Sequence, residues 1–177
     1  MISKFSGLKL IHHLDHVKAT LEHRNMYPVH VNVDPTNYCN HHCIWCSQHE
    51  LQQEKAMGIN YDALVAALAE ARDLGLKAVT LIGAGDPTVY KRFLDLTREI
   101  SRLGLDLGMF THGGYPSEWR DHILETFTWV RFSLDAATTE VHNLVHDVDN
   151  RFDQIVSNLR DLAEKRKGPT AVQNVLQ

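Results

Sequence analysis

The chain has 177 residues, enough for one domain with a sizeable core, and its 44% hydrophobic and 23% charged residues are ordinary for a globular protein. A formal net charge of -4 offers no basic excess to neutralise phosphates, which argues against nucleic acid as a partner. No apolar run reaches the roughly 20 residues that a membrane span needs, and the N-terminus lacks the apolar stretch of a signal peptide. We therefore expect a cytoplasmic protein that keeps its cysteines reduced and does not associate with membranes.

Strand and helix patterns alternate along the sequence. Apolar residues at helical spacing predict an N-terminal helix over 10–24, and a β-rich run over 29–33 predicts the first strand. Further strands are predicted over 77–82, 105–110, 128–135 and from 170 onward. Amphipathic helices between the strands are predicted to begin near Asn60, Val89, Ser117 and Phe152.

Alternation of this kind predicts an α/β fold with a parallel sheet. Five strands with four crossover helices correspond to about four and a half βα units, which is an incomplete TIM-like barrel. In such folds the carboxyl ends of the strands carry the active site. The stretch over 136–150 reads as a solvated loop or short helix, so we assign no metal to His142 and His146.

All the cysteines lie in one short loop after the first predicted strand. Cys39, Cys43 and Cys46 are spaced by four and three residues, and their odd number leaves a thiol over in any disulfide pairing. Three thiolates can hold an iron–sulfur cubane and leave one iron open for chemistry. The alternative is a structural zinc site of the Cys3His type, whose fourth ligand is His41, His42 or His49.

Polar or glycine-rich residues also follow the other predicted strands. Gly83, Ala84, Gly85 and Asp86 follow the second strand, where small residues let a ligand approach the backbone. Thr111 and His112 end the third strand, and Ser133 and Asp135 end the fourth. Because side chains alternate along a strand, Ser133 and Asp135 are expected to share a face.

The pattern C-x3-C-x-aromatic-C, with Trp45 in the aromatic position, resembles the cluster-binding loop of the radical S-adenosylmethionine (SAM) superfamily. Gly83 to Asp86 resemble the family's GGE motif, which binds the amino group of SAM, although Ala84 and Asp86 replace glycine and glutamate. Thr111-His112-Gly113 resembles its T-N-G strand ending, with histidine in place of asparagine, and Ser133 to Asp135 resemble its S-x-D ending. The resemblance implies that Cys39, Cys43 and Cys46 hold a 4Fe-4S cluster and perform the catalytic electron transfer. It further implies contacts to SAM from a second set of residues: Trp45, Gly83, Ala84, Gly85, Asp86, Thr111, His112, Ser133 and Asp135.

The resemblance implies an oxygen-sensitive enzyme that cleaves SAM to a 5′-deoxyadenosyl radical, which abstracts hydrogen from a peptide or small-metabolite substrate. An electron donor such as flavodoxin or ferredoxin is implied as a partner. The family's core usually has about six βα units, so we expect an N-terminal helical extension over 1–28 and an apparently truncated core over 29–177. Two alternatives remain, a truncated module that binds cluster and SAM without turnover and the zinc module. The open barrel edge could also support self-association.

Overall fold

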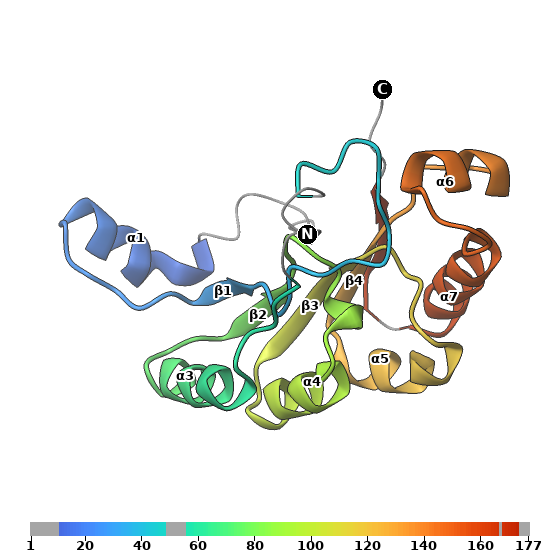
Figure 1. Ribbon diagram of the computed structural model, residues 1–177. Helices are drawn as coiled ribbons and strands as arrows, with labels where there is room; N and C mark the ends of the chain where they lie inside the picture. The colour runs from blue at the N-terminus through green and yellow to red at the C-terminus, as the bar shows by residue number, and fades with distance from the viewer. Residues whose placement is uncertain (1–10, 49–55, 167, 174–177) are drawn as a thin grey trace.

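The computed structural model describes residues 11–48, 56–166 and 168–173 (Figure 1). Within these ranges five strands form one parallel sheet whose spatial order follows the chain, β1-β2-β3-β4-β5. The strands are β1 (His30–Val33), β2 (Ala78–Leu81), β3 (Asp106–Thr111), β4 (Trp129–Ser133) and β5 (Thr170–Gln173). The helices are α1 (Leu14–Leu21), α3 (Tyr61–Asp73), α4 (Phe93–Arg102), α5 (Arg120–Thr126), α6 (Thr139–His146) and α7 (Phe152–Lys165), with 3-10 turns η2 (Pro87–Val89) and η3 (Ser117–Trp119).

Sequential parallel pairing is the strand order of a βα barrel, and the predicted α/β class is confirmed. In the described ranges β1 and β5 each pair with one neighbour only, so the sheet is open like part of a barrel. None of the described helices combines the length and the apolar character that crossing a membrane requires.

The hydrophobic core lies between the sheet and the helices that follow one another along its outer side (Figure 1). Leu81, Leu107 and Phe132 from three neighbouring strands are fully buried and belong to the same core as Leu96 and Ile100 of α4. Burying side chains of this size contributes about 1.5–3 kcal/mol each, which explains why the amphipathic helices pack here. Because all five strands are parallel, their carboxyl ends lie at the same edge of the sheet.

The inner face of the sheet carries larger polar and aromatic side chains. Phe110 is paired in register with Arg131, whose guanidinium lies 4.9 Å from the Phe110 ring centroid. Trp129 packs edge-to-face on Phe110 and occupies the space beside Gly108, where any Cβ would overlap the indole. Ser133, at the carboxyl end of β4, lies on the same face as Trp129 and Arg131.

Most predicted elements are present, with shifted ends. Helix α1 is shorter than the predicted 10–24. Helix α3 begins at the predicted cap, where Asn60 Oδ1 accepts a hydrogen bond from Ala63 N at 2.9 Å. Ser117 was expected to cap a helix, but it begins η3 and makes no capping bond, because α5 starts only at Arg120. Strand β4 ends at Ser133, so Asp135 lies in the following loop.

Candidate active site

The cysteine loop lies across the carboxyl edge of the sheet and is attached on both sides. Next to β2, Asp86 N donates to Tyr38 O at 3.1 Å. Next to α6, His42 N donates to His146 O at 3.0 Å, and Ile44 N donates to Val145 O at 3.1 Å. A segment more than 100 positions away in the sequence therefore fixes the loop from its far side, as the ribbon shows (Figure 1).

A cavity of about 350 Å³ lies under this loop, and every predicted site residue lines it. Its walls come from the cysteine loop and from the ends of β2, β3, β4 and β5. The predicted residues on it are Cys39, Cys43, Trp45, Cys46, Gly83, Ala84, Gly85, Asp86, Thr111, His112, Ser133 and Asp135. Residues on it that the sequence did not single out as SAM or cluster contacts are His41, Ile82, Phe110, His146 and Gln173. The structure thus brings the four strand-end motifs together, while their binding roles remain predictions.

The three thiols are free, half-buried and face this one cavity. Burial, with the Asp86 carboxylate as the next cause, raises the pKa of Cys39 to about 12. Burial also raises the pKa of Cys43 to about 12, with Cys46 as the next cause. A nearby cation or metal centre reverses this preference, because coordination deprotonates a thiol outright. Three soft donors on one wall of a cavity fit a cubane cluster with an open iron.

The turn after β2 has a structural reason to contain small residues. A Cβ at Gly85 would overlap the Tyr38 carbonyl, and a Cβ at Gly83 would overlap the Asp34 carboxylate. Asp34 also accepts a hydrogen bond from Ala84 N at 2.9 Å. The turn therefore needs glycine at 83 and 85 to pack against the segment that leads into the cysteine loop. This packing brings the turn to the cavity wall.

Asp86 is a buried junction between the ends of β2 and β3. One carboxylate oxygen accepts from Thr88 N at 2.8 Å, and the other accepts from Thr111 Oγ1 at 2.9 Å and His112 N at 2.8 Å. The side chain is 4% exposed. Its acceptor capacity is largely used by the protein, so a direct side-chain contact with SAM stays a prediction that competes with this structural role.

His112 connects the end of β3 to the cysteine loop. Gly114 N donates to its Nδ1 at 2.9 Å, so the ring proton lies on Nε2, which donates to Asn40 Oδ1 at 2.8 Å. Burial lowers the pKa of His112, in agreement with a neutral ring. His112 therefore lies at the cavity, where it was predicted, and it holds the loop residue next to Cys39.

Beyond β4, Ser133 and Asp135 both reach the cavity although the strand has ended. The Asp135 side chain is 4% exposed, and its Oδ2 lies 3.4 Å from His146 Nε2. A hydroxyl and a carboxylate side by side can bind the carboxylate and ribose hydroxyls of a ligand, respectively.

A group of four buried histidines lies beside the cysteines: His41, His112, His142 and His146. The expectation that 136–150 is solvated was wrong for His142 and His146, which are 0% and 1% exposed. The His41 and His112 rings stack with centroids 3.8 Å apart, and those of His142 and His146 stack at 4.3 Å. The reason is that α6 turns its histidines toward the cysteine loop and leaves Leu144 71% exposed. The spacing of His142 and His146 by four residues was the available signal, but it does not identify the partner of that helix face.

The zinc alternative named three candidate fourth ligands. His41 lies beside the cysteines, and its backbone N donates to Cys39 Sγ at 3.4 Å. His42 is exposed, and His49 lies outside the described residues. Trp45, in the aromatic position of the loop, packs edge-to-face on His146 with centroids 5.8 Å apart.

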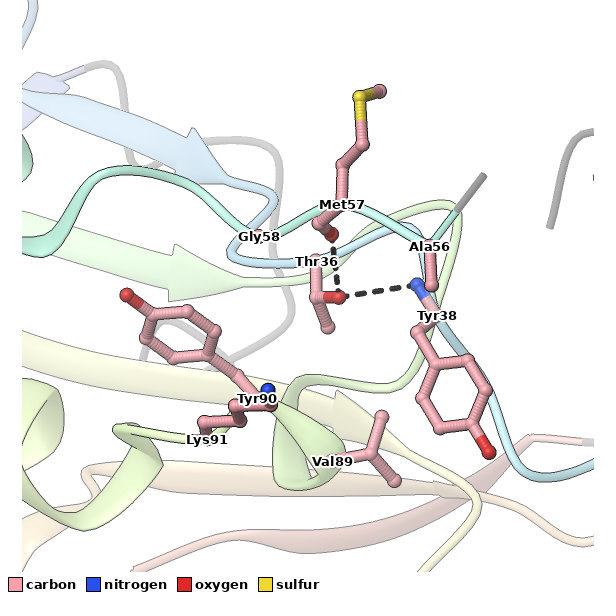
Figure 2. Close-up of a pocket in the computed structure, with 8 residues that line it drawn as sticks. All are labelled: Thr36, Tyr38, Ala56, Met57, Gly58, Val89, Tyr90 and Lys91. Carbon is pink, nitrogen blue, oxygen red and sulfur yellow. Dashed lines mark hydrogen bonds between the residues drawn. The ribbon is translucent and has the colours of Figure 1, made fainter. Parts of the chain in front are cut away.

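A second cavity, of about 370 Å³, lies on the other side of the loop's first residues (Figure 2). Thr36 and Met57 form one end, where Thr36 Oγ1 donates to Met57 O at 2.8 Å, and the Tyr38 and Tyr90 rings are both drawn on its wall. It shares no lining residue with the cysteine cavity. Its lining contains none of the cysteines and none of the residues predicted to contact SAM.

Comparison with known proteins gives a consistent result. The model of the radical SAM superfamily matches residues 33–176. A curated protein of Pyrococcus furiosus, described as a tungsten-containing aldehyde ferredoxin oxidoreductase cofactor-modifying protein, is 34% identical over 79 residues, which are 44% of this chain and 22% of that protein. The structure of Streptococcus suis SuiB bound to S-adenosylmethionine superposes with a TM-score of 0.73 at 18% identity, covering 98% of this chain and 41% of SuiB. SuiB bound to its precursor peptide SuiA gives a TM-score of 0.71 at 15% identity, covering 99% of this chain and 39% of SuiB.

The chain thus spans about a fifth of the length of the curated relative and about two fifths of the length of SuiB. The family match covers most of the described sheet and includes the cysteine loop and all the strand-end motifs. A 4Fe-4S cluster and SAM are the cofactors of this family, and the thiols and cavity described above fit both. The chain belongs to the radical SAM superfamily.

Proposed function

We propose that this chain forms the cofactor-binding part of a radical SAM enzyme, in which Cys39, Cys43 and Cys46 hold the cluster. The observation that carries the proposal is the single cavity in which these thiols meet the ends of β2, β3 and β4. When bound and reduced, the cluster supplies an electron that splits the sulfonium of SAM into methionine and a 5′-deoxyadenosyl radical. A flavodoxin or ferredoxin is the proposed source of that electron.

The residues of the chain would bind SAM and orient it. The turn at Gly83 and Gly85 brings backbone groups to the wall, where they can contact the methionine end of SAM. Ser133 and Asp135 are proposed to contact its carboxylate and ribose, since both reach the cavity from the end of β4. Asp86 and His112 would act mainly by holding the turn and the loop in place.

For the substrate we propose a peptide. The support is the likeness to SuiB, whose structure contains the precursor peptide SuiA. A small metabolite is the alternative. The inner face of the sheet, with Phe110, Trp129 and Arg131 at its surface, offers apolar and cationic contacts on the approach to the cavity.

The proposed arrangement of the chain is a helical extension over 1–28 followed by the core from 29 onward. The alternative activity is a module that binds cluster and SAM but cleaves SAM slowly. In that case substrate would not accelerate the release of 5′-deoxyadenosine.

The test is anaerobic reconstitution with iron and sulfide, followed by incubation with SAM and dithionite and chromatography of the products. We expect a brown protein that releases 5′-deoxyadenosine. Cys39→Ala, Cys43→Ala and Cys46→Ala should each lose the full cluster, whereas Ser47→Ala, an exposed neighbour in the same loop, should keep it. If any one of the three cysteine variants retains a full cluster with wild-type spectra, the ligand assignment is wrong.

A further inference from the structure

A second set of metal-binding atoms overlaps the cysteine loop. One donor atom from each of His41, Cys43 and His146 lies within 4.8 Å of the other two. His146 Nδ1 lies 3.2 Å from Cys43 Sγ and 3.3 Å from His41 Nδ1. Cys39 and Cys46 do not belong to this set.

These separations match those of ligands around one zinc ion. With Zn–S near 2.3 Å and Zn–N near 2.0–2.1 Å, tetrahedral ligand atoms lie roughly 3.3–3.6 Å apart. Two of the three distances between the ligand atoms are already within a few tenths of an ångström of that spacing. A cation placed between the three atoms would bring Cys43 Sγ and the His41 ring, which lie within 4.8 Å of each other, closer together.

The protonation of His146 suits ligation. The Asp135 carboxylate lies 3.4 Å from Nε2 and favours the ring proton there, so the lone pair of Nδ1 points toward Cys43 and His41. A carboxylate behind a ligating histidine is a common arrangement in metal sites, where it orients the ring and raises its basicity.

Polar atoms in this group also lack partners. His41 and His146 are 2% and 1% exposed, and Nε2 of His41 and Nε2 of His146 make no hydrogen bond in the described structure. Two imidazoles whose Nδ1 atoms lie 3.3 Å apart can share a cation through those atoms, whereas the unpaired Nε2 atoms stay outside the ligand set.

We propose that His41, Cys43 and His146 hold a single zinc-class divalent cation when the chain carries no cluster, with a fourth coordination position open to water. The site differs from a Cys3His zinc site because it uses one cysteine. It shares Cys43 with the cluster, so the two metal states exclude each other. The inference does not depend on the proposed enzymatic activity, since it concerns the chain before a cluster is inserted.

Binding would connect the cysteine loop to α6 through metal bonds in addition to the two backbone hydrogen bonds already present. Any cation that binds only the folded chain adds stability in proportion to the logarithm of its concentration over its dissociation constant. The site would therefore keep the loop in place in the cluster-free chain, and iron–sulfur insertion would have to displace the cation.

The test is titration of the cluster-free, reduced full chain with Co²⁺, whose visible bands report tetrahedral geometry and whose near-ultraviolet band reports thiolate ligation. We expect one Co²⁺ per chain with both signatures. His146→Ala, His41→Ala and Cys43→Ala should each weaken binding at least tenfold, and Asp135→Asn should weaken it about 10–100-fold as loss of a supporting carboxylate does. The exposed-site variant His42→Ala is the matched control and should bind as wild type, and Cys39→Ala, whose thiol accepts from His41 N, should lose less affinity than Cys43→Ala.

Two results would overturn the proposal. One is a loss of affinity in Cys39→Ala or Cys46→Ala as large as in Cys43→Ala, which would indicate a three-cysteine site. The other is wild-type protein without a tetrahedral cobalt spectrum. The comparison among the three cysteine variants decides the matter even if a histidine variant fails to fold. Iron counting on separately reconstituted protein keeps failure of the cluster assignment distinct, because a chain that binds Co²⁺ as described can still fail to assemble iron and sulfide.

Discussion

Asp86 provides the sharpest test of how the site is held together. Replacing it with alanine removes the acceptor for Thr88 N, Thr111 Oγ1 and His112 N at a position that is 4% exposed. Each buried hydrogen bond to a charged group contributes about 1.5–3 kcal/mol, and water entering from the adjoining cavity would replace part of that. We therefore expect Asp86→Ala to lower the free energy of unfolding by about 3–5 kcal/mol, a large share of the 5–15 kcal/mol typical of a domain.

The assay is urea unfolding of the cluster-free, reduced protein, with circular dichroism as the readout. Asp34→Ala is the matched control, because its carboxylate binds one backbone amide, Ala84 N, at an exposed position, and it should cost no more than about 1 kcal/mol. Asp86→Asn should cost nearly as much as the alanine variant, since an amide cannot accept from all these donors. If Asp86→Ala is no more destabilising than Asp34→Ala, the carboxylate is not the junction described here.

Three further predictions concern binding, acid stability and association. Asp135→Ala should weaken SAM binding to the cluster-loaded protein by one to two orders of magnitude, measured by equilibrium dialysis, because a buried charge-assisted contact is lost; unchanged affinity would contradict its role. For the cluster-free chain, burial lowers the pKa of His41 and His146 to about 2 and about 4 from 6.5, so the unfolded chain binds more protons below about 6.5. The free energy of unfolding should therefore be highest above pH 6.5 and should fall by up to about 1.4 kcal/mol per pH unit for each ring as the pH drops toward 4. Equal unfolding free energies at pH 7 and pH 5 would be evidence against this prediction. Val172 on the edge strand β5 and Leu144 on α6 are 47% and 71% exposed, so the isolated chain should associate with rising concentration in light scattering, whereas a monomer at every concentration would refute this.

The sequence was sufficient to predict the order of the strands and the edge of the sheet where the candidate site residues meet. The apolar periodicity of α4 and the buried run of β2 depend on local pattern, and both elements occur where the pattern indicates. Parallel strands place their carboxyl ends at one edge, so residues as distant as Cys39 and Asp135 could be expected in one cavity before any coordinates were considered.

What the sequence could not predict depends on long-range packing. The helical spacing of His142 and His146 was visible, but nothing local indicates that this face packs on the cysteine loop while Leu144 faces outward. The turn sequence Asp86-Pro87-Thr88 indicates a local cap, whereas the bonds from Thr111 and His112 to the same carboxylate join residues 25 and 26 positions apart. The small residues at Gly83 and Gly85 suggested ligand approach, and the structure adds a second cause, their close packing on Asp34 and Tyr38.

The most direct measurement of the central claim is electron paramagnetic resonance of the reconstituted, dithionite-reduced chain before and after SAM is added. Three cysteine ligands leave one iron of a four-iron cluster open, so the account predicts a reduced-cluster signal whose g-values shift when SAM binds that iron. Asp135→Ala should require more SAM for the same shift. A reduced cluster whose signal does not change with saturating SAM, or a chain that assembles no cluster, would contradict the assignment of this cavity.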